Sequence, residues 1–192
     1  MHDPRYKRAL GVGYAVSPTG ADHNHNLHDT AFAKEGKALK ELRFYGEDFA
    51  PLPPEDLSEA KIRMLWTKTR ERGFVNSLVM CDFVPWTPEE WQEAIYATTG
   101  WRLSPKEMME VGERTLQLTR LFNLREGIGP EEDRLPERFF HPFRKGSPEA
   151  YLDREAFQEG VRTYWRLAGW EKGSVDPERL RALGLEAFLL GG

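Results

Sequence analysis

The feature that most constrains the fold is a helix-start signature that recurs along the chain. Thr87-Pro88-Glu89-Glu90 and Ser104-Pro105-Lys106-Glu107 each place a capping side chain before a proline, with an acidic residue following. Such a cap accepts a backbone N–H of the first turn, proline is tolerated there, and the helix dipole favours acids at that end. Ser58 and Asp176-Pro177 provide two further starts. We therefore predict helices beginning at these four places.

Apolar residues three and four apart support the same helices. The predicted buried faces are Ile62, Leu65, Trp66 and Thr69; Met108, Val111, Leu118, Leu121 and Phe122; and Phe157, Val161, Tyr164, Trp165 and Ala168. Gly73 is expected to weaken the first of these helices, and residues 10–16 fit a short helix or a strand. No strand pairing is convincing. The fold class is therefore predicted to be all-α, one irregular helical domain over 1–192, with a Gly/His-rich segment 1–45 and a helical body 56–190.

Composition limits the kinds of partner. The net charge is −4 and the basic residues are scattered, so a nucleic-acid partner is not expected. No stretch of about 18 apolar residues predicts a membrane span, and the first residues lack the apolar core of a signal peptide. Cys81 is the single cysteine, which suits a reducing compartment. A cytoplasmic protein is expected.

Three blocks of sequence resemble the aldehyde ferredoxin oxidoreductase family. The first is Asp3-Pro4-Arg5 with Gly11-Val12-Gly13-Tyr14-Ala15 and Gly20-Ala21-Asp22-His23. The second, Asn76-Ser77-Leu78-Val79-Met80-Cys81, is similar to the family's Asp-x-x-Gly-Leu-Cys element. The third and longest runs from Gly112 through Arg120-Leu121-Phe122-Asn123 to Phe139. The order and spacing of the blocks resemble the last third of that family's enzymes.

The resemblance implies both an activity and an incomplete site. Family members oxidise aldehydes to carboxylates with tungsten held by two pterin dithiolenes, and electrons pass through a 4Fe-4S cluster to ferredoxin. An N-terminal β-rich domain carries the cofactor, and helical domains cover it. We therefore expect an N-terminal domain or subunit as partner, with ferredoxin and an aldehyde substrate, and no cofactor bound to this chain alone.

The second block supplies the residues expected at the cofactor. Cys81 stands where the family has its fourth cluster ligand, and the other three cysteines would come from the N-terminal part. Asn76 and Met80 stand at pterin-contact positions. Asn76 replaces the family's aspartate and so loses a charge, and Val79 replaces a glycine. The alternative reading is that Cys81 is a buried structural cysteine and that residues 76–81 are simply a core segment.

The histidines of the N-terminal segment are the remaining candidates. His23 aligns with a family histidine near the metal, where an imidazole can move a proton as water adds to the aldehyde. His25 stands where the family can carry a basic residue and is expected to face the cofactor or the channel. The alternative for His23 is a loop histidine bonded to backbone.

Two other functions remain open from the sequence. His23, His25, His28 and Asp29 could form an independent zinc or nickel site, although their spacing is not a standard zinc pattern. The chain could also be a cofactor-free interaction or scaffold protein that kept the helical fold. In that case the apolar surface that faced the β-rich domain would be repacked with polar groups or covered by self-association as a homodimer.

Overall fold

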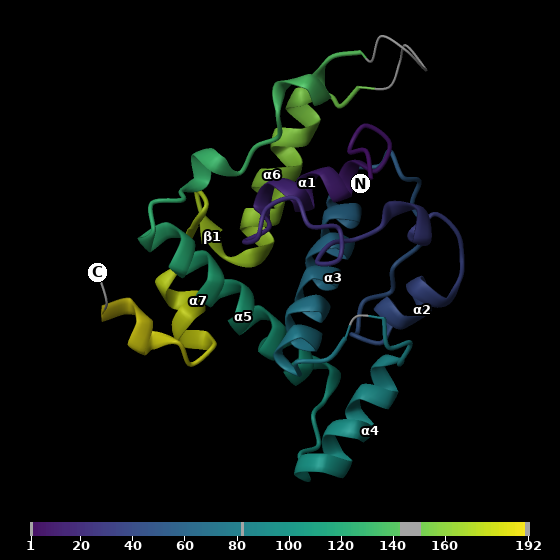
Figure 1. Ribbon diagram of the computed structural model, residues 1–192, viewed down its shortest axis with the longest axis vertical. Helices are drawn as coiled ribbons and strands as arrows, with labels where there is room; N and C mark the ends of the chain where they lie inside the picture. The colour runs from purple at the N-terminus through teal and green to yellow at the C-terminus, as the bar shows by residue number, and fades with distance from the viewer. Residues whose placement is uncertain (1, 82, 143–150, 191–192) are drawn as a thin grey trace.

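The computed structural model describes residues 2–81, 83–142 and 151–190, and the chain is helical as predicted (Figure 1). The α-helices are α1 (Arg8–Val16), α2 (Lys37–Arg43), α3 (Glu59–Ser77), α4 (Pro88–Thr99), α5 (Pro105–Arg125), α6 (Arg154–Ala168) and α7 (Pro177–Ala182). Single 3-10 turns are η1 (Asp29–Phe32), η2 (Pro130–Glu132), η3 (Glu137–Phe140) and η4 (Glu186–Leu190). A two-residue hairpin, β1 (Trp170–Glu171) with β2 (Ser174–Val175), is the sheet of the described residues.

The helix starts are confirmed. Thr87 and Ser104 each form a complete capping box, with Glu90 and Glu107 as the returning carboxylates. The Ser58 hydroxyl accepts the Lys61 backbone N–H that begins α3. These caps satisfy backbone donors that would otherwise lack a partner, so the local sequence alone defines where the long helices begin.

Helix α1 depends on a distant residue instead. Its own N-cap, Lys7, makes no side-chain cap bond, and the carboxylate of Asp29 accepts from the backbone N–H groups of Ala9 at 3.2 Å and Leu10 at 3.0 Å. The ammonium of Lys61 lies 3.6 Å from Asp29, and both side chains are fully buried. This tertiary cap selects helix over strand for residues 10–16.

The two longest helices, α3 and α5, cross at a pair of glycines. A Cβ built on Gly112 would lie 1.8 Å from the carbonyl oxygen of Arg70, and one on Gly73 would lie 2.7 Å from the carbonyl oxygen of Gly112. The missing side chains therefore let the two backbones touch. The expectation that Gly73 only weakens α3 was incomplete, because this glycine makes the crossing possible.

The predicted buried face of α5 is right only in part. Leu118 and Leu121 are half-buried against the cluster of Leu180, Leu183 and Leu185, but the most buried residues of the second half are polar. Met108 is buried as expected, but Phe122 is 55% exposed, and Glu113, Gln117 and Arg120 are buried in its place. The reason is that these polar groups find partners in the C-terminal part of the chain. The guanidinium of Arg120 donates two bonds to Asp133, at 2.8 and 2.9 Å.

The same polar face fastens α6 and the hairpin to α5. The amide of Gln117 donates to the Ala168 carbonyl at 2.7 Å and accepts from the Trp170 indole at 2.7 Å. The carboxylate of Asp133 also accepts from the indole of Trp165 at 2.8 Å. The predicted stripe of α6 is confirmed, with Trp165 half-buried at its edge.

Helix α4 lies at one end of the long axis of the molecule (Figure 1). Trp91 and Ile95 attach it to the ends of α3 and α5 through a small cluster with Phe74, Val75 and Met108. Within the described residues no helix is both long and apolar enough to cross a membrane.

The connection from α3 to α4 begins with an unfavourable backbone conformation. Val79 has a φ of 57°, in the left-handed region, and its N–H donates to the Asn76 carbonyl at 3.0 Å. This is the conformation that glycine usually supplies just after a helix. A β-branched residue is strained there, and its side chain gains little burial in return because it is 91% exposed.

We predict that Gly112→Ala lowers the free energy of unfolding by about 3 kcal/mol, because the new methyl group would overlap the carbonyl of Arg70 and force the helices apart. Urea denaturation measures this loss. Gly36→Ala is the matched control, since nothing lies within 4 Å of its added Cβ, and it should change stability by less than about 0.5 kcal/mol. Equal stability of the two variants would contradict the close crossing.

We predict that Val79→Gly raises the free energy of unfolding by roughly 1 kcal/mol, because glycine adopts the left-handed conformation without a steric penalty. Val79→Ala should give a smaller gain, because its Cβ retains most of the penalty. Thermal unfolding of the three proteins would test this order, and a loss of stability in the glycine variant would contradict it.

Candidate functional site

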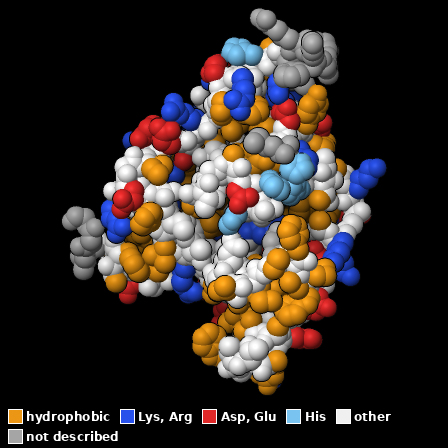
Figure 2. Space-filling view, in the orientation of Figure 1, with side chains coloured by type: hydrophobic (Ala, Val, Ile, Leu, Met, Phe, Trp, Pro, Cys, Tyr) orange, Lys and Arg blue, Asp and Glu red, His pale blue; other side chains and the backbone are white. Residues whose placement is uncertain are grey.

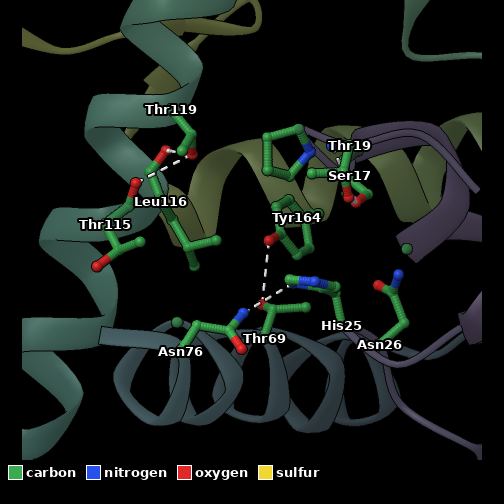
Figure 3. A pocket seen from close by; sticks show the side chains of 14 residues that line it. Ser17, Thr19, His25, Asn26, Thr69, Asn76, Thr115, Leu116, Thr119 and Tyr164 are labelled. Carbon is green, nitrogen blue, oxygen red and sulfur yellow. Dashed lines mark hydrogen bonds between the residues drawn. The ribbon is translucent and has the colours of Figure 1, made fainter. Parts of the chain in front are cut away.

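The candidate site is built around a cavity of about 170 Å³ between the N-terminal segment and the helical body. Its walls come from the end of α1 and residues 17–26, from one face of α3, from the middle of α5, and from α6 (Figure 3). Four separate parts of the sequence thus meet there. The close α3–α5 crossing brings two of those walls together.

The structure brings together two of the residues expected at the cofactor. The amide nitrogen of Asn76, in the last turn of α3, lies 3.2 Å from Nδ1 of His25, and both residues line the cavity (Figure 3). The other ring nitrogen of His25 lies 3.3 Å from the carboxylate of Asp22. Since the amide nitrogen can only donate, Nδ1 of His25 accepts and its Nε2 carries the proton toward Asp22.

His23 lies in a different group. Its ring meets those of His2 and His28 edge to face, with centroids 5.4 and 5.8 Å away. His23 is exposed and is not part of the cavity lining, so the structure does not place it with His25 and Asn76. Figure 2 shows histidine side chains gathered on this face of the molecule.

The suggested zinc or nickel site does not form. His25 pairs with Asp22 and Asn76, whereas Asp29 is buried at the start of α1. In the described part of the chain no group of three histidine, cysteine or acidic side chains is arranged to hold a metal ion. The four candidate ligands are adjacent in sequence but face different neighbours, because the turn at residues 22–29 directs them apart.

The histidine group contains a cation. The ammonium of Lys7 lies 3.1 Å from Nδ1 of His2 and 3.4 Å from Nδ1 of His28, an arrangement that requires neutral imidazoles. Burial of the His28 ring, and secondarily the charge of Lys7, lowers the pKa of His28 to about 4. Burial and Lys7 lower the pKa of His2 as well.

Cys81 is exposed and its thiol is free, so the reading of a cysteine sealed in the core is wrong. Its surroundings are apolar and open: Val79 is 91% exposed, Phe83 86% and Met80 37%. Figure 2 shows hydrophobic side chains gathered over α4 and the segment that leads to it. A core interpretation of residues 76–81 fails for the same reason.

Most residues of the cavity lining were not predicted to belong to a site, and three of these are buried polar residues. Asn26 is 1% exposed and lies behind His25, while Thr69 and Tyr164 share a hydrogen bond of 3.1 Å across the cavity wall. In the sequence, Thr69 and Tyr164 fall on predicted apolar helix faces, so they were expected to be core residues. Asn26 stood in the Gly-, His- and Asn-rich stretch, where nothing in the sequence distinguished it from its neighbours.

The family model and the relatives that match this chain all belong to one family. The model of "Aldehyde ferredoxin oxidoreductase, domains 2 & 3" matches residues 1–185. The tungsten-containing aldehyde ferredoxin oxidoreductase of Pyrococcus horikoshii is 29% identical over 98% of this chain, and that of Pyrococcus abyssi is 28% identical over 98%. The chain spans 30% of the length of these relatives.

A solved structure shows the same fold. The active site complex BamBC of benzoyl coenzyme A reductase, determined with 1,5-dienoyl-CoA, superimposes with a TM-score of 0.60 at 18% identity. The match covers 98% of this chain and 31% of that one.

We predict that the chain loses stability as the pH falls from 6.5 to 4, and that His28→Gln removes part of this loss. The pKa of His28 is lowered by folding, so in this range the unfolded chain binds the proton and the folded chain does not. The contribution is about 1 kcal/mol, allowing for partial exposure of the ring. Thermal unfolding at several pH values measures it.

His141→Gln is the control, because His141 is exposed and pairs with Glu137 at the surface. This variant should follow the pH dependence of the unmodified chain. An identical pH dependence for all three proteins would contradict the assignment to His28.

Proposed function

Because the chain belongs to the aldehyde ferredoxin oxidoreductase family, we propose that it is the helical, C-terminal part of a tungsten-pterin aldehyde oxidoreductase that works only with an N-terminal part. Its match to domains 2 and 3 and its 30% share of the relatives' length support this role. The observation that carries the proposal is the hydrogen bond between His25 and Asn76. It joins, across 51 positions of sequence, two residues that the family resemblance assigned to one cofactor.

The chemistry of this pair fits a pterin. A pterin ring presents alternating donors and acceptors along its edge, and an exposed amide with an adjacent imidazole offers both kinds of group. Asn76 is exposed and His25 half-buried at the mouth of the cavity. The pair carries no fixed negative charge, unlike the aspartate that the family has in place of Asn76, so the complementarity rests on hydrogen bonds.

The proposed reaction is RCHO + H2O → RCOOH + 2e− + 2H+. The tungsten-pterin group, when bound, supplies the two-electron oxidation. This chain would contribute proton transfer, with His23 as the acceptor. His23 is exposed and lies against the rings of His2 and His28, so a proton that it accepts can pass to solvent. His25 and Asn76 would orient the cofactor's polar edge.

Cys81 would supply one of four ligands to a 4Fe-4S cluster, and the N-terminal part the other three. Iron needs an accessible thiolate, and the exposed, free thiol of Cys81 meets that requirement. Electrons would leave through this cluster to ferredoxin. One thiolate cannot hold the cluster, so we expect the isolated chain to retain less than about a tenth of an equivalent of iron.

The N-terminal part would cover the exposed apolar segment around Cys81. Val79, Phe83 and Trp86 expose large apolar areas there, as does Trp101 after α4. Large exposed apolar side chains of this kind are typical of an interface. When the N-terminal part is absent, two copies would cover this surface by pairing through it as a homodimer.

A second candidate is a cofactor-free scaffold, and the conformation of Val79 favours it. The backbone there adopts the glycine-like conformation, yet a branched and exposed side chain stands where close approach of a cofactor is expected. Under this proposal the chain binds a protein partner through its apolar segment and does not bind a pterin.

We predict that co-expression with the β-rich N-terminal part yields a complex that retains tungsten and reduces a dye in the presence of aldehyde, and that neither part does so alone. Cys81→Ala should lower cluster content and dye reduction roughly tenfold or more, because the cluster loses a ligand. Ser77→Ala is the control, since Ser77 lies in the same block but bonds to Thr115 and to the α3 backbone.

A complex that forms without tungsten or pterin would favour the scaffold. A Cys81→Ala complex with full iron content and activity would contradict the ligand role of this cysteine.

A further inference from the structure

A second cavity, of about 430 Å³, shares no lining residue with the cavity of the candidate site. Its walls are α3, the first half of α5, α7 and the connection that follows α2. The volume lies within the range of about 300–1,000 Å³ that is usual for pockets that hold small molecules. The proposed reaction uses none of the residues that line it.

Arg70 of α3 lines this cavity as a mostly buried cation with few hydrogen bonds. Its side chain is 17% exposed, and its Nη2 donates to Oγ1 of Thr67 at 3.3 Å. Its Nε is buried and has no hydrogen-bond partner in the described part of the chain. A guanidinium carries five N–H donors. Most N–H groups of the two terminal nitrogens therefore have no acceptor among the described residues.

The two carboxylates beside Arg70 are committed to other arginines. Glu47 accepts from Nε and Nη2 of Arg63 at 3.1 and 2.9 Å, and Glu113 pairs with Arg179. The terminal nitrogens of Arg70 consequently lie 4.0 Å from Glu47 and 3.9 Å from Glu113, too far for hydrogen bonds. Burial lowers the pKa of Arg70, and the charges of Glu113 and Glu47 oppose this only in part.

The charged residues of the lining and their ion-pair partners carry a positive surplus. Glu110 is shared by Lys106 at 3.7 Å and Arg114 at 4.0 Å, so it neutralises only one of them. The chain as a whole has a net charge of −4, so this surplus is local. The ion pairs around the cavity join five basic side chains, Arg63, Arg70, Lys106, Arg114 and Arg179, to three carboxylates, Glu47, Glu110 and Glu113.

We propose that this cavity binds a small organic oxyanion, a carboxylate or a phosphate ester, whose oxygens accept from the terminal nitrogens of Arg70. The planar fork of a guanidinium matches two oxygens of such a group, and a charge-assisted bond of this kind is about twice as strong as a neutral one. Lys106, 86% exposed, supplies a second cation at the rim. Met109 and Leu183 offer apolar contact to a short carbon body. The inference does not rest on the proposed function.

The test is binding of three probes to the full chain at low ionic strength: inorganic phosphate, acetate and acetamide. Titration followed by NMR, at the Nε–Hε group of Arg70 and the amides of Met109 and Leu183, gives each dissociation constant. Phosphate and acetate are expected to give saturable shifts. Acetamide has nearly the shape of acetate without its charge, so it is expected to bind at least about tenfold more weakly than acetate. The tighter of the two ions identifies the class of ligand.

Variants locate the binding. Arg70→Gln should weaken phosphate binding about tenfold or more, because the charged donor is lost. Glu47→Gln should strengthen it roughly threefold, because a negative charge beside Arg70 is removed. Arg166→Gln is the control, since Arg166 pairs with Glu59 at the surface of α6, and it should bind phosphate normally.

Each result decides a separate part of the inference. Equal binding of acetate and acetamide overturns the charge basis, and weaker phosphate binding by Glu47→Gln does the same. Unchanged phosphate binding by Arg70→Gln overturns the location; if that variant does not fold, the probe comparison and Glu47→Gln still decide. No saturable shift with either ion overturns the site.

A last measurement separates a free ligand from a partner's side chain. Phosphate is titrated into the complex of this chain with the N-terminal part. Binding that persists supports a free oxyanion, and binding that disappears assigns the cavity to an acidic side chain of the N-terminal part and overturns the small-molecule ligand. Tungsten retention and dye reduction are independent of all these results, so the proposed function would fail separately.

Discussion

The close approach of α3 and α5 is the constraint on which the rest of the structure depends. Gly73 and Gly112 remove the two side chains that would separate the backbones, so the carbonyl of Arg70 lies against Gly112. Helices normally pack at 8–10 Å between axes, and small residues allow the near end of that range or less. Because these are the longest helices, their crossing fixes the positions of every element that packs on either of them.

Buried polar groups of α5 fix the positions of the elements in the C-terminal part of the chain. Arg120 joins η2 and the hairpin through Asp133 and the Gly173 carbonyl, and its guanidinium lies 4.6 Å from the ring centroid of Trp170. Glu113, 1% exposed, pairs with Arg179 of α7. Each of these groups would be costly to bury alone, so the network specifies one arrangement of α6, the hairpin and α7.

The candidate site follows from the same geometry. Asn76 lies one turn beyond Gly73 on α3, and Thr115 and Leu116 lie one turn beyond Gly112 on α5, so the crossing places them on facing walls of one cavity. The buried Asp29–Lys61 pair holds α1 and the turn that carries His25 and Asn26 against α3. The segment that follows α3, with Cys81, extends from this framework toward open surface.

The sequence by itself determined where α3, α4 and α5 begin, because a capping side chain and a following proline or acid act within one turn of backbone. It also indicated the family and selected Asn76 and His25, through short motifs that need no knowledge of packing. Tertiary structure alone decided that α1 is a helix, that α5 buries Glu113, Gln117 and Arg120, and that Asn26, Thr69 and Tyr164 line a cavity. These depend on partners 13 to 95 positions away. Periodicity cannot predict them, because it reports which residues share a face and not what that face meets.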